Sequence, residues 1–392
     1  MGLGFPTREV VEGKARILVP DVEGHHIPTS GDPVFYNPAM KPNRDTAVLA
    51  LAAHTKTLKH PPTILEPLAG SGVRSIRLAL EASPEAQITM GDLNPSAVKL
   101  ATINASRNHV EAKIRLMDAH LLLALHSHPG GRADYVDIDP FGPPTGFTPQ
   151  AVSATRPGGI LALTATDLAP LCGSGRQACL RKYGGWPLRG EFCHETALRL
   201  LVASTARAAA VQECGVKPLY SYYMGHYVRA YFLVERGARR ADQALRQLGF
   251  VKRCPSCARW WVSDDNHRDE CPCGSTVEVG GPLWLGELSD PAFTRRMAQA
   301  AEEAPHLRGS KAHRVVLQVL AEQGFPLGFY HLDTVSRLVG APSIPTKKVV
   351  EALTEKGHQA VPTHFHPRGV KTTASYEEVL EVVKALGATQ PS

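Results

Sequence analysis

Four cysteines lie within twenty residues of one another, as the pairs Cys254-x2-Cys257 and Cys271-x-Cys273. Four thiolates on two tight turns are enough to close a tetrahedral zinc site, and a closed site has no open position for catalysis. The second pair is one residue shorter than a usual zinc knuckle, so one turn must be atypical. A redox pair is the alternative, but no thioredoxin-like context surrounds these cysteines. The spacing predicts a structural Zn²⁺ site, in which His267 of the intervening loop is a less suitable ligand.

A second chemical feature is the glycine-containing segment AGSG at 69–72, which joins a strand-like run at 63–68 directly to a helical pattern. Gly70 and Gly72 would let a ligand approach the backbone at the carboxyl edge of a parallel sheet. Ser75 fills the third glycine position of the dinucleotide-binding pattern, so a nicotinamide dinucleotide is the weaker interpretation. Taken alone, such a loop is also typical of an ordinary tight turn.

Two aspartates follow this loop at the ends of later strand-like runs. Asp92 lies twenty-two residues after Gly70, close to the offset at which an acidic side chain meets ribose hydroxyls. Asp118 could accept a hydrogen bond from an adenine amino group. Helix N-capping is the alternative for both aspartates, and it is stronger for Asp118. Together they indicate an adenosine without a pyrophosphate, which favours S-adenosylmethionine as cofactor.

The segment Asp139-Pro140-Phe141-Gly142 follows the fourth strand-like run and should reach the same edge of the sheet. An exocyclic base amine is a poor nucleophile, and acceptors that hold its N–H groups would direct its lone pair toward a methyl donor. The Asp139 carboxylate and the Pro140 carbonyl are two such acceptors, and Phe141 offers a ring on which a flipped base can stack. A simple strand-ending turn is the alternative. Asp137 faces the same way and is a candidate supporting carboxylate.

His194-Glu195 begins the His-Glu-x-x-His pattern of metalloproteases, but Leu198 occupies the position of the second histidine. That function is excluded. We expect His194 at the start of a helix or in a substrate pocket, and Cys193 as a buried, inert thiol.

These residues need a scaffold that brings strand ends together, and the central part of the chain predicts one. Short apolar runs alternate with helical patterns near 73–81 and 96–108, which is typical of a doubly wound α/β domain with a mainly parallel sheet. The strand-like runs are 63–68, 88–93, 112–117, 133–139 and 158–166. A long helix near 195–214 and two strands at 219–225 and 228–235 should complete the domain.

The remainder divides into three further regions. Residues 1–45 are expected to form an irregular lead-in, 46–240 the catalytic domain, 241–290 a zinc module, and 291–392 a winged-helix-like C-terminal α+β domain. Three helical patterns and a β-hairpin predict the winged-helix outline: 313–324, 332–340, 346–357 and 361–375. The polar stretch 286–305 is expected to be the linker.

The composition of the 392-residue chain fits a globular protein, with 43% hydrophobic and 20% charged residues and a net charge of +6. No run of eighteen apolar residues occurs, and no charged-then-apolar leader opens the sequence, so we expect a cytoplasmic protein without a membrane span. Residues 181–240 hold ten Lys and Arg against four Asp and Glu, which suggests an anionic partner.

Arginines, lysines and tyrosines interleave there, and the expected wing adds two more cations. These could follow an RNA backbone through phosphate contacts, although the tyrosines fit the core of a packed sheet equally well. The candidates are Arg181, Lys182, Arg189, Arg229, Arg236, Arg239 and Arg240, then Tyr220, Tyr222, Tyr223 and Tyr227, and finally Arg368 and Lys371.

Several segments, in order along nearly the whole chain, resemble the tRNA guanine-N2,N2-dimethyltransferase family. They are PVFYNPAMKPNRD, LEPLAGSGVRSIR, GDLNPSAVKLATINASRN, DAHLLL, DYVDIDPFGPP, CHETALRLL, GHYVRAYFLVE and the late CPSC and CPC. The resemblance implies a Rossmann-like class I methyltransferase fold. It also implies methyl transfer from S-adenosylmethionine to the guanine N2 amine at tRNA position 26. The neighbouring guanosine is a possible second target.

The resemblance implies cofactor contacts from Arg44, Arg74, Asp92, Asp118 and Ala119, and a catalytic role for Asp139. An arginine beside the methionine carboxylate makes physical sense, since its planar fork pairs with carboxylates; an ordinary ion pair is the alternative. The expected partner is tRNA, with a monomeric enzyme and no obligate protein partner. The competing functions are methylation of adenine or cytosine amines in DNA, and an inactive zinc-containing RNA-binding protein.

Overall fold

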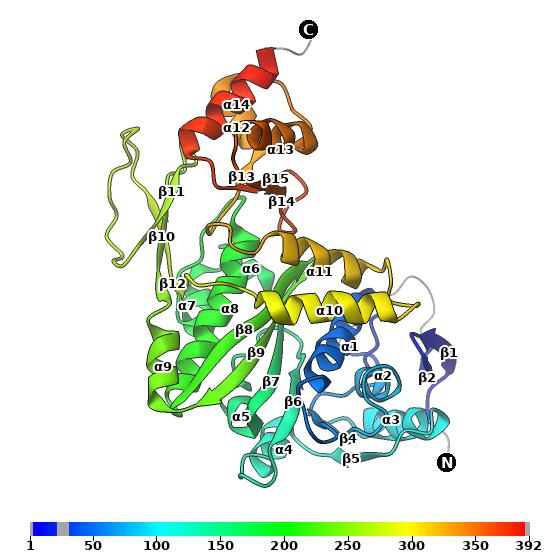
Figure 1. The fold of residues 1–392 in the computed structure, drawn as a ribbon. Helices are drawn as coiled ribbons and strands as arrows, with labels where there is room; N and C mark the ends of the chain where they lie inside the picture. Colours follow the sequence, from blue (N-terminus) through cyan, green and yellow to red (C-terminus); the bar gives the residue numbers. More distant parts are fainter. Residues whose placement is uncertain (1–2, 22–30, 389–392) are drawn as a thin grey trace.

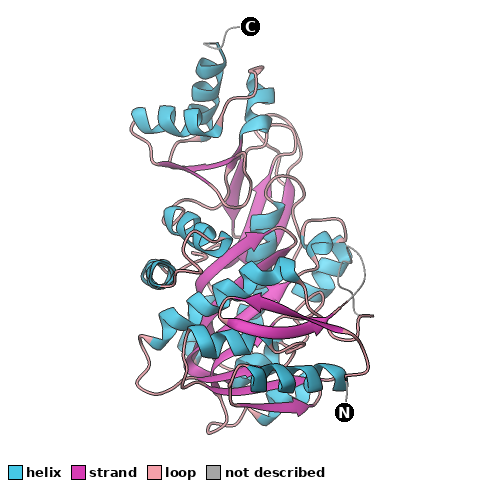
Figure 2. Cartoon of the chain, turned by 90° about the vertical axis from the view of Figure 1, so that its right-hand side faces the viewer, coloured by secondary structure: helices cyan, strands magenta, loops and turns pink. Residues whose placement is uncertain are grey.

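The structure is a computed structural model that describes residues 3–21 and 31–388. A twisted sheet forms its centre (Figure 2). It has seven strands in the order β5-β4-β3-β6-β7-β9-β8. The strands in that order are β5 (Ala112–Leu116), β4 (Gln87–Asp92), β3 (Thr63–Glu66), β6 (Ala133–Ile138), β7 (Thr155–Ala165), β9 (Tyr227–Arg236) and β8 (Cys214–Met224). The first five pair in parallel, and β9 runs antiparallel to both of its neighbours. The expected α/β sheet is therefore confirmed.

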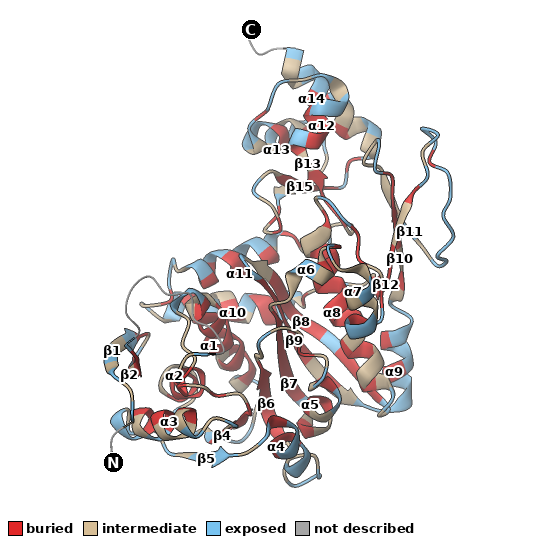
Figure 3. Cartoon of the chain, turned by 180° about the vertical axis from the view of Figure 1, so that it is seen from behind, coloured by how far each residue is buried: buried red, intermediate tan, exposed pale blue. Residues whose placement is uncertain are grey.

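Helices cover both faces of this sheet and create two large apolar cores (Figure 1). One core involves α1 (Lys41–Thr55), α2 (Val73–Glu81) and α3 (Pro95–Arg107). The opposite core involves α4 (Ala119–Leu125), α5 (Thr148–Ala154) and α8 (Cys193–Ala210). The strands β6, β7 and β9 are largely buried between these layers, as expected for a sheet covered on both faces (Figure 3).

The N-terminal lead-in is more regular than its composition predicts. Strands β1 (Thr7–Glu12) and β2 (Ala15–Pro20) form an antiparallel hairpin. The side chain of Asn104 on α3 exchanges hydrogen bonds with the backbone of Leu18, at 2.7 and 2.9 Å, and attaches the hairpin to the catalytic domain. Its buried face consists of the alternating apolar residues 15, 17 and 19. Three residues are too few for this alternation to be recognised as a strand pattern in the sequence.

The expected linker is wrong, because helix α10 (Pro291–Glu303) occupies most of it. Its apolar side, with Phe293 and Met297 buried, packs on α1. Helix α11 (Lys311–Ala321) follows and packs on α10 and α1. The helix expected to begin the C-terminal unit thus belongs to the core of the catalytic domain, since its apolar stripe contacts α1.

Two smaller units complete the described chain. Helix α9 (Ala238–Leu245) leads into a three-stranded antiparallel sheet of β10 (Leu248–Arg253), β11 (Trp260–Ser263) and β12 (Glu278–Trp284). The C-terminal unit has its own core. It contains β13 (Tyr330–His331), α12 (Leu332–Val339), α13 (Thr346–Glu355), β14 (Ala360–Pro362), β15 (Gly369–Thr372) and α14 (Tyr376–Ala388). The helices of the described segments all fall short of the length and apolarity that a bilayer span requires.

Candidate active site

A cavity of about 490 Å³ lies at the carboxyl ends of β3 and β6, where open α/β sheets bind their ligands. Its wall contains six of the residues selected from the sequence. These are Arg44, Gly70, Arg74, Asp139, Pro140 and Phe141. The segment 35–40 before α1 forms the opposite wall. Parallel strands deliver their ends to one edge, which is why distant parts of the chain meet here.

The glycine loop after β3 takes the backbone shape that its sequence predicts. Gly70 and Gly72 adopt φ values of +53° and +76°, in the left-handed region that favours glycine. A Cβ atom at Gly70 would lie 3.1 Å from the carbonyl oxygen of Phe35. Gly72 is the N-cap residue of α2, and a Cβ there would crowd Ala101 on α3. The loop is thereby held close to the cavity.

Asp92 organises this loop from the end of β4. One carboxylate oxygen accepts from the Gly70 amide at 2.8 Å, and the other accepts from the Asn94 amide at 2.9 Å. Asp118 is an exposed N-cap of α4, accepting from the amides of His120 and Leu121. Gly72, Asp92, Asp118 and Ala119 stand at neighbouring strand ends and do not line the cavity itself. Their cofactor roles stay predictions.

Asp139 is held by Arg74, whose guanidinium donates to its carboxylate. Arg74 is buried and also donates to Glu66 at 3.1 Å and to the Asn43 side-chain oxygen at 2.7 Å. The Asp139 side chain keeps 16% of its surface exposed, so one edge of the carboxylate remains accessible from the cavity. Arg74 therefore connects Glu66, at the end of β3, to the expected catalytic residue Asp139.

Behind this pair lies a second buried ion pair, between Asp137 on β6 and Arg229 on β9. The guanidinium of Arg229 donates to both Asp137 oxygens, at 2.5 and 3.2 Å, and the Nε atom of Arg74 lies 3.6 Å from the same carboxylate. The adjacent guanidinium groups hold the pKa of Asp137 below its usual value despite burial that would raise it. Charges of alternating sign thus run from Arg229 to Asp139.

This placement contradicts the expectation that Arg229 follows an RNA backbone, because its side chain is fully buried. Tyr220, Tyr222 and Tyr227 are also buried, in the core of the sheet. Lys371 is buried and pairs with Glu195 at 3.1 Å. Because layers cover both faces of the central sheet, consecutive residues of β9 are buried irrespective of their charge. Arg181, Lys182 and Arg189 are exposed and remain candidates for RNA contact.

Glu66, the last residue of β3, lines the cavity and was missed in the sequence. It accepts hydrogen bonds from Arg74 and from both the amide and the hydroxyl of Ser75. Burial raises the pKa of Glu66 to about 7, with the nearby Asp137 carboxylate adding to the shift and Arg74 opposing it. The sequence did contain a signal for Glu66, since an acidic residue at the end of an apolar strand is expected at the edge of the sheet where ligands bind.

Phe141 is 58% exposed and meets the ring of Phe35 edge-on, with centroids 4.5 Å apart. This exposed ring lines the cavity. His226, in the turn between β8 and β9, also lines the cavity. His226 lies in the segment GHYVRAYFLVE quoted for the resemblance, but no role was assigned to it from the sequence, because only the β8–β9 turn brings it to the cavity.

For Arg44 the sequence left two interpretations open, a cofactor contact and an ordinary ion pair, and the position of its side chain is compatible with both. It lines the cavity, yet its guanidinium already donates to both oxygens of Glu12 on β1, at 2.7 and 2.6 Å. Its charge, with that of Arg77, lowers the pKa of Glu12 to about 2 despite burial. The hairpin is thus fastened to the cavity wall, and the ring of Tyr36 packs against Arg44.

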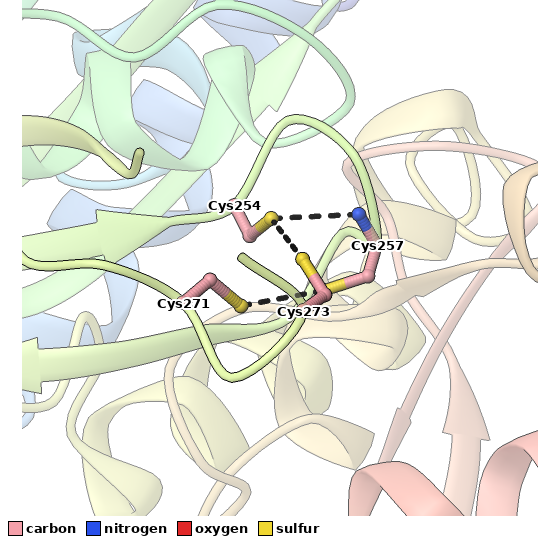
Figure 4. Close-up of side chains that lie close together, drawn as sticks. All are labelled: Cys254, Cys257, Cys271 and Cys273. Atoms are coloured by element: carbon pink, nitrogen blue, oxygen red, sulfur yellow. Dashed lines mark hydrogen bonds between the residues drawn. The ribbon is translucent and has the colours of Figure 1, made fainter. Parts of the chain in front are cut away.

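The zinc module brings its four cysteines together in two short turns, as the sequence predicts (Figure 4). The sulfurs of Cys254 and Cys273 lie 3.4 Å apart, and those of Cys257 and Cys271 lie 3.6 Å apart. Four Zn–S bonds of about 2.3 Å in a tetrahedron would place the sulfurs about 3.8 Å apart. The donor set therefore fits a structural Zn²⁺ ion, and His267 is not required.

Known proteins resemble the chain over nearly its full length. The family model of N2,N2-dimethylguanosine tRNA methyltransferase matches residues 13–384. The tRNA (guanine(26)-N(2))-dimethyltransferase of Methanothermobacter thermautotrophicus is 36% identical, over 96% of this chain and 98% of the relative. The tRNA (guanine(26)-N(2)/guanine(27)-N(2))-dimethyltransferase of Aquifex aeolicus is 35% identical, over 96% of both chains.

A solved structure agrees with the same comparison. Trm1 from Pyrococcus horikoshii, in complex with S-adenosyl-L-methionine, superposes with a TM-score of 0.83 at 33% identity. The alignment covers 96% of this chain and all of that one. The shared fold includes the C-terminal part as well as the central sheet.

Proposed function

The chain belongs to the N2,N2-dimethylguanosine tRNA methyltransferase family, and from this premise we propose that it methylates the N2 amine of guanosine 26 in tRNA. The methyl donor is S-adenosylmethionine, and the products are N2-methyl- and then N2,N2-dimethylguanosine. The single observation that supports this most directly is the strand tip at Asp139-Pro140-Phe141, which presents two acceptors and an exposed ring to one cavity.

In the proposed mechanism the strand tip holds the flipped guanine. The Asp139 carboxylate and the Pro140 carbonyl accept the amine hydrogens, while Phe141 stacks on the base. Bound S-adenosylmethionine supplies an electrophilic methyl group on its sulfonium sulfur. The N2 lone pair attacks that carbon as the carbon–sulfur bond breaks, and the excess proton on nitrogen passes to Asp139. Arg74 keeps the Asp139 carboxylate oriented, since it holds one oxygen while the other stays accessible.

We assign the cofactor to the cavity and the adjoining strand ends. Asp92 would accept from the ribose hydroxyls, Asp118 from the adenine amine, and an arginine would face the methionine carboxylate. The proposed cofactor-binding residues are Arg44, Gly70, Gly72, Arg74, Asp92, Asp118 and Ala119. The Asp92 carboxylate already fixes Gly70, so ligand binding and loop position are coupled.

The zinc module and the C-terminal unit would grip the body of the tRNA. Exposed cations near α7 (Arg176–Tyr183) and on the C-terminal unit provide sequence-independent phosphate contacts. We further propose that the enzyme acts as a monomer in the cytoplasm, where tRNA substrates are accessible.

Nucleoside mass spectrometry of unmodified tRNA transcripts tests the function. A transcript with guanosine at position 26 should yield N2,N2-dimethylguanosine, and a transcript with adenosine there should not. Product from the second transcript would show that position 27 is also a target, as the name of the Aquifex relative states for that protein. Label from the cofactor in duplex DNA alone would contradict the proposal. Failure to bind S-adenosylhomocysteine in a calorimetric titration would favour an inactive RNA-binding protein.

A further inference from the structure

Outside the main cavity, two thiols and an imidazole converge at the start of α8. Cys172 follows the short helix α6 (Leu168–Leu171), and Cys193 and His194 are the first residues of α8. The two sulfurs and a ring nitrogen of His194 all lie within 4.8 Å of one another. All three residues are partly buried, so the cluster is shielded yet reachable from solvent. Cys2His is a ligand set that Zn²⁺ uses in proteins.

The imidazole of His194 is held in place but incompletely bonded. Its ring stacks on Tyr223, with centroids 3.8 Å apart and planes 9° from parallel. Its Nδ1 atom is buried and has no hydrogen-bond partner among the described residues. A buried polar atom without a partner is costly, and groups of this kind often mark an unseen water or ion. Coordination by one ring nitrogen would use an imidazole that packing has already oriented.

The cluster lies at a junction of the molecule. Tyr223 is near the end of β8, and the turn that follows carries His226 into the wall of the main cavity. Glu195, next to His194, accepts from the Gly328 amide at 3.1 Å and from Lys371 of the C-terminal unit at 3.1 Å. An ion on His194 would therefore stiffen the place where the catalytic domain meets the C-terminal unit.

We propose that Cys172, Cys193 and His194 bind a second Zn²⁺ ion, separate from the four-cysteine site. Binding would release the two thiol protons and form two Zn–thiolate bonds and one Zn–imidazole bond. Three protein ligands leave one coordination position for water or for an oxygen of a bound substrate. The two metal sites thus differ in kind, one closed by four sulfurs and one open.

Metal analysis of the full-length protein tests this without any measurement of methyl transfer. The protein is saturated with ZnSO₄, desalted and measured by mass spectrometry of its metal content. Two zinc ions per chain are expected for the wild type, and one for the Cys172→Ser/Cys193→Ser double variant. Cys214→Ser is the matched control, because Cys214 is a buried free cysteine outside both clusters and should leave two ions bound.

A second variant separates ligand loss from misfolding. His194→Gln keeps both thiols and should lose the second zinc at a chelator concentration that leaves the wild type fully loaded. Its Tm with only the four-cysteine zinc bound should equal that of the Cys172→Ser/Cys193→Ser double variant in the same state. A single zinc in the saturated wild type, unaltered by the double substitution, overturns the proposal. A Cys172–Cys193 disulfide in the peptide map of the freshly purified protein also overturns it.

Discussion

The methyl-transfer cavity and the zinc module are stabilised in opposite ways. The cavity stands on a seven-stranded sheet between two extensive apolar cores. The zinc module has a small cluster of its own, in which Cys254, Cys271 and Val277 are the buried members. Where little apolar surface is buried, a metal can replace a core. Loss of ligands should therefore unfold the module, whereas loss of polar groups in the cavity should mainly impair chemistry.

The largest effect is expected when a ligand of the four-cysteine zinc site is removed. Cys254→Ser should lose the zinc of the four-cysteine site and unfold residues 254–277, because the remaining cluster cannot maintain the two turns. Hydrogen exchange with mass spectrometry would show the change confined to this region, while S-adenosylhomocysteine still binds. Unchanged zinc content would refute the assignment.

In the cavity, Asp139→Ala should lower kcat by about 10³-fold, since both an acceptor for the amine and a proton acceptor are lost. Affinities for cofactor and tRNA should stay close to wild type, as measured by titration. The Asp139→Asn variant retains one acceptor oxygen and serves as the matched control. Loss of both affinities would mean that Asp139 supports the fold. The cavity and the zinc module would then not differ in the way proposed.

Arg229→Met is the substitution most able to break the contrast, because Arg229 lies under the cavity and is fully buried. Removing it takes away the guanidinium that donates to both oxygens of the buried Asp137 carboxylate and leaves Arg74, at 3.6 Å, as its cation, with an expected destabilisation of about 3 to 4 kcal/mol. Urea unfolding gives the measurement, and Arg240→Met, at an exposed ion pair, should change stability by less than about 1 kcal/mol. Equal effects of the two substitutions would show that the buried charge chain has no special role.

Glu66 adds a pH dependence to the catalytic domain. Burial raises its pKa to about 7, so the folded chain retains a proton that the unfolded chain releases near pH 4.5. Its contribution to stability is therefore greatest below pH 4.5 and falls as the pH rises to about 7. The glutamine of the Glu66→Gln variant cannot ionise. As the pH rises from 4.5 to 7, the free energy of unfolding of the variant should therefore increase relative to that of the wild type by up to about 3 kcal/mol. A stability difference that stays constant with pH contradicts this.

The smallest effect is expected at the cavity mouth. Phe141→Leu should raise KM for tRNA about tenfold, because base stacking on an aromatic ring contributes about 1 to 3 kcal/mol. Cofactor affinity should not change. Val211→Ala, at an exposed apolar residue just beyond α8, is the control and should leave KM unaltered.

Much of this was visible in the sequence. The order of strands and helices through the catalytic domain was confirmed, and α2 begins and ends at the predicted residues. The four cysteines that the spacing selected lie together, and the Asp139 segment lines the cavity, whereas the catalytic role of that segment stays a prediction. Helix α10 was missed because its short apolar stripe in a polar stretch is recognisable only when α1 is present to cover it, and the N-terminal hairpin was missed because its alternating apolar residues are few.

The sequence by itself determined which chemical groups are available, since turn residues, strand periodicity and cysteine spacing act over a few residues. Only the tertiary structure decided which charges lie inside. Arg229 and Lys371 read as surface cations, yet pairing with Asp137 and Glu195 buries both. The physical reason is that a buried charge needs a neutralising partner, and for these two cations the partner comes from a distant segment that the local sequence does not specify.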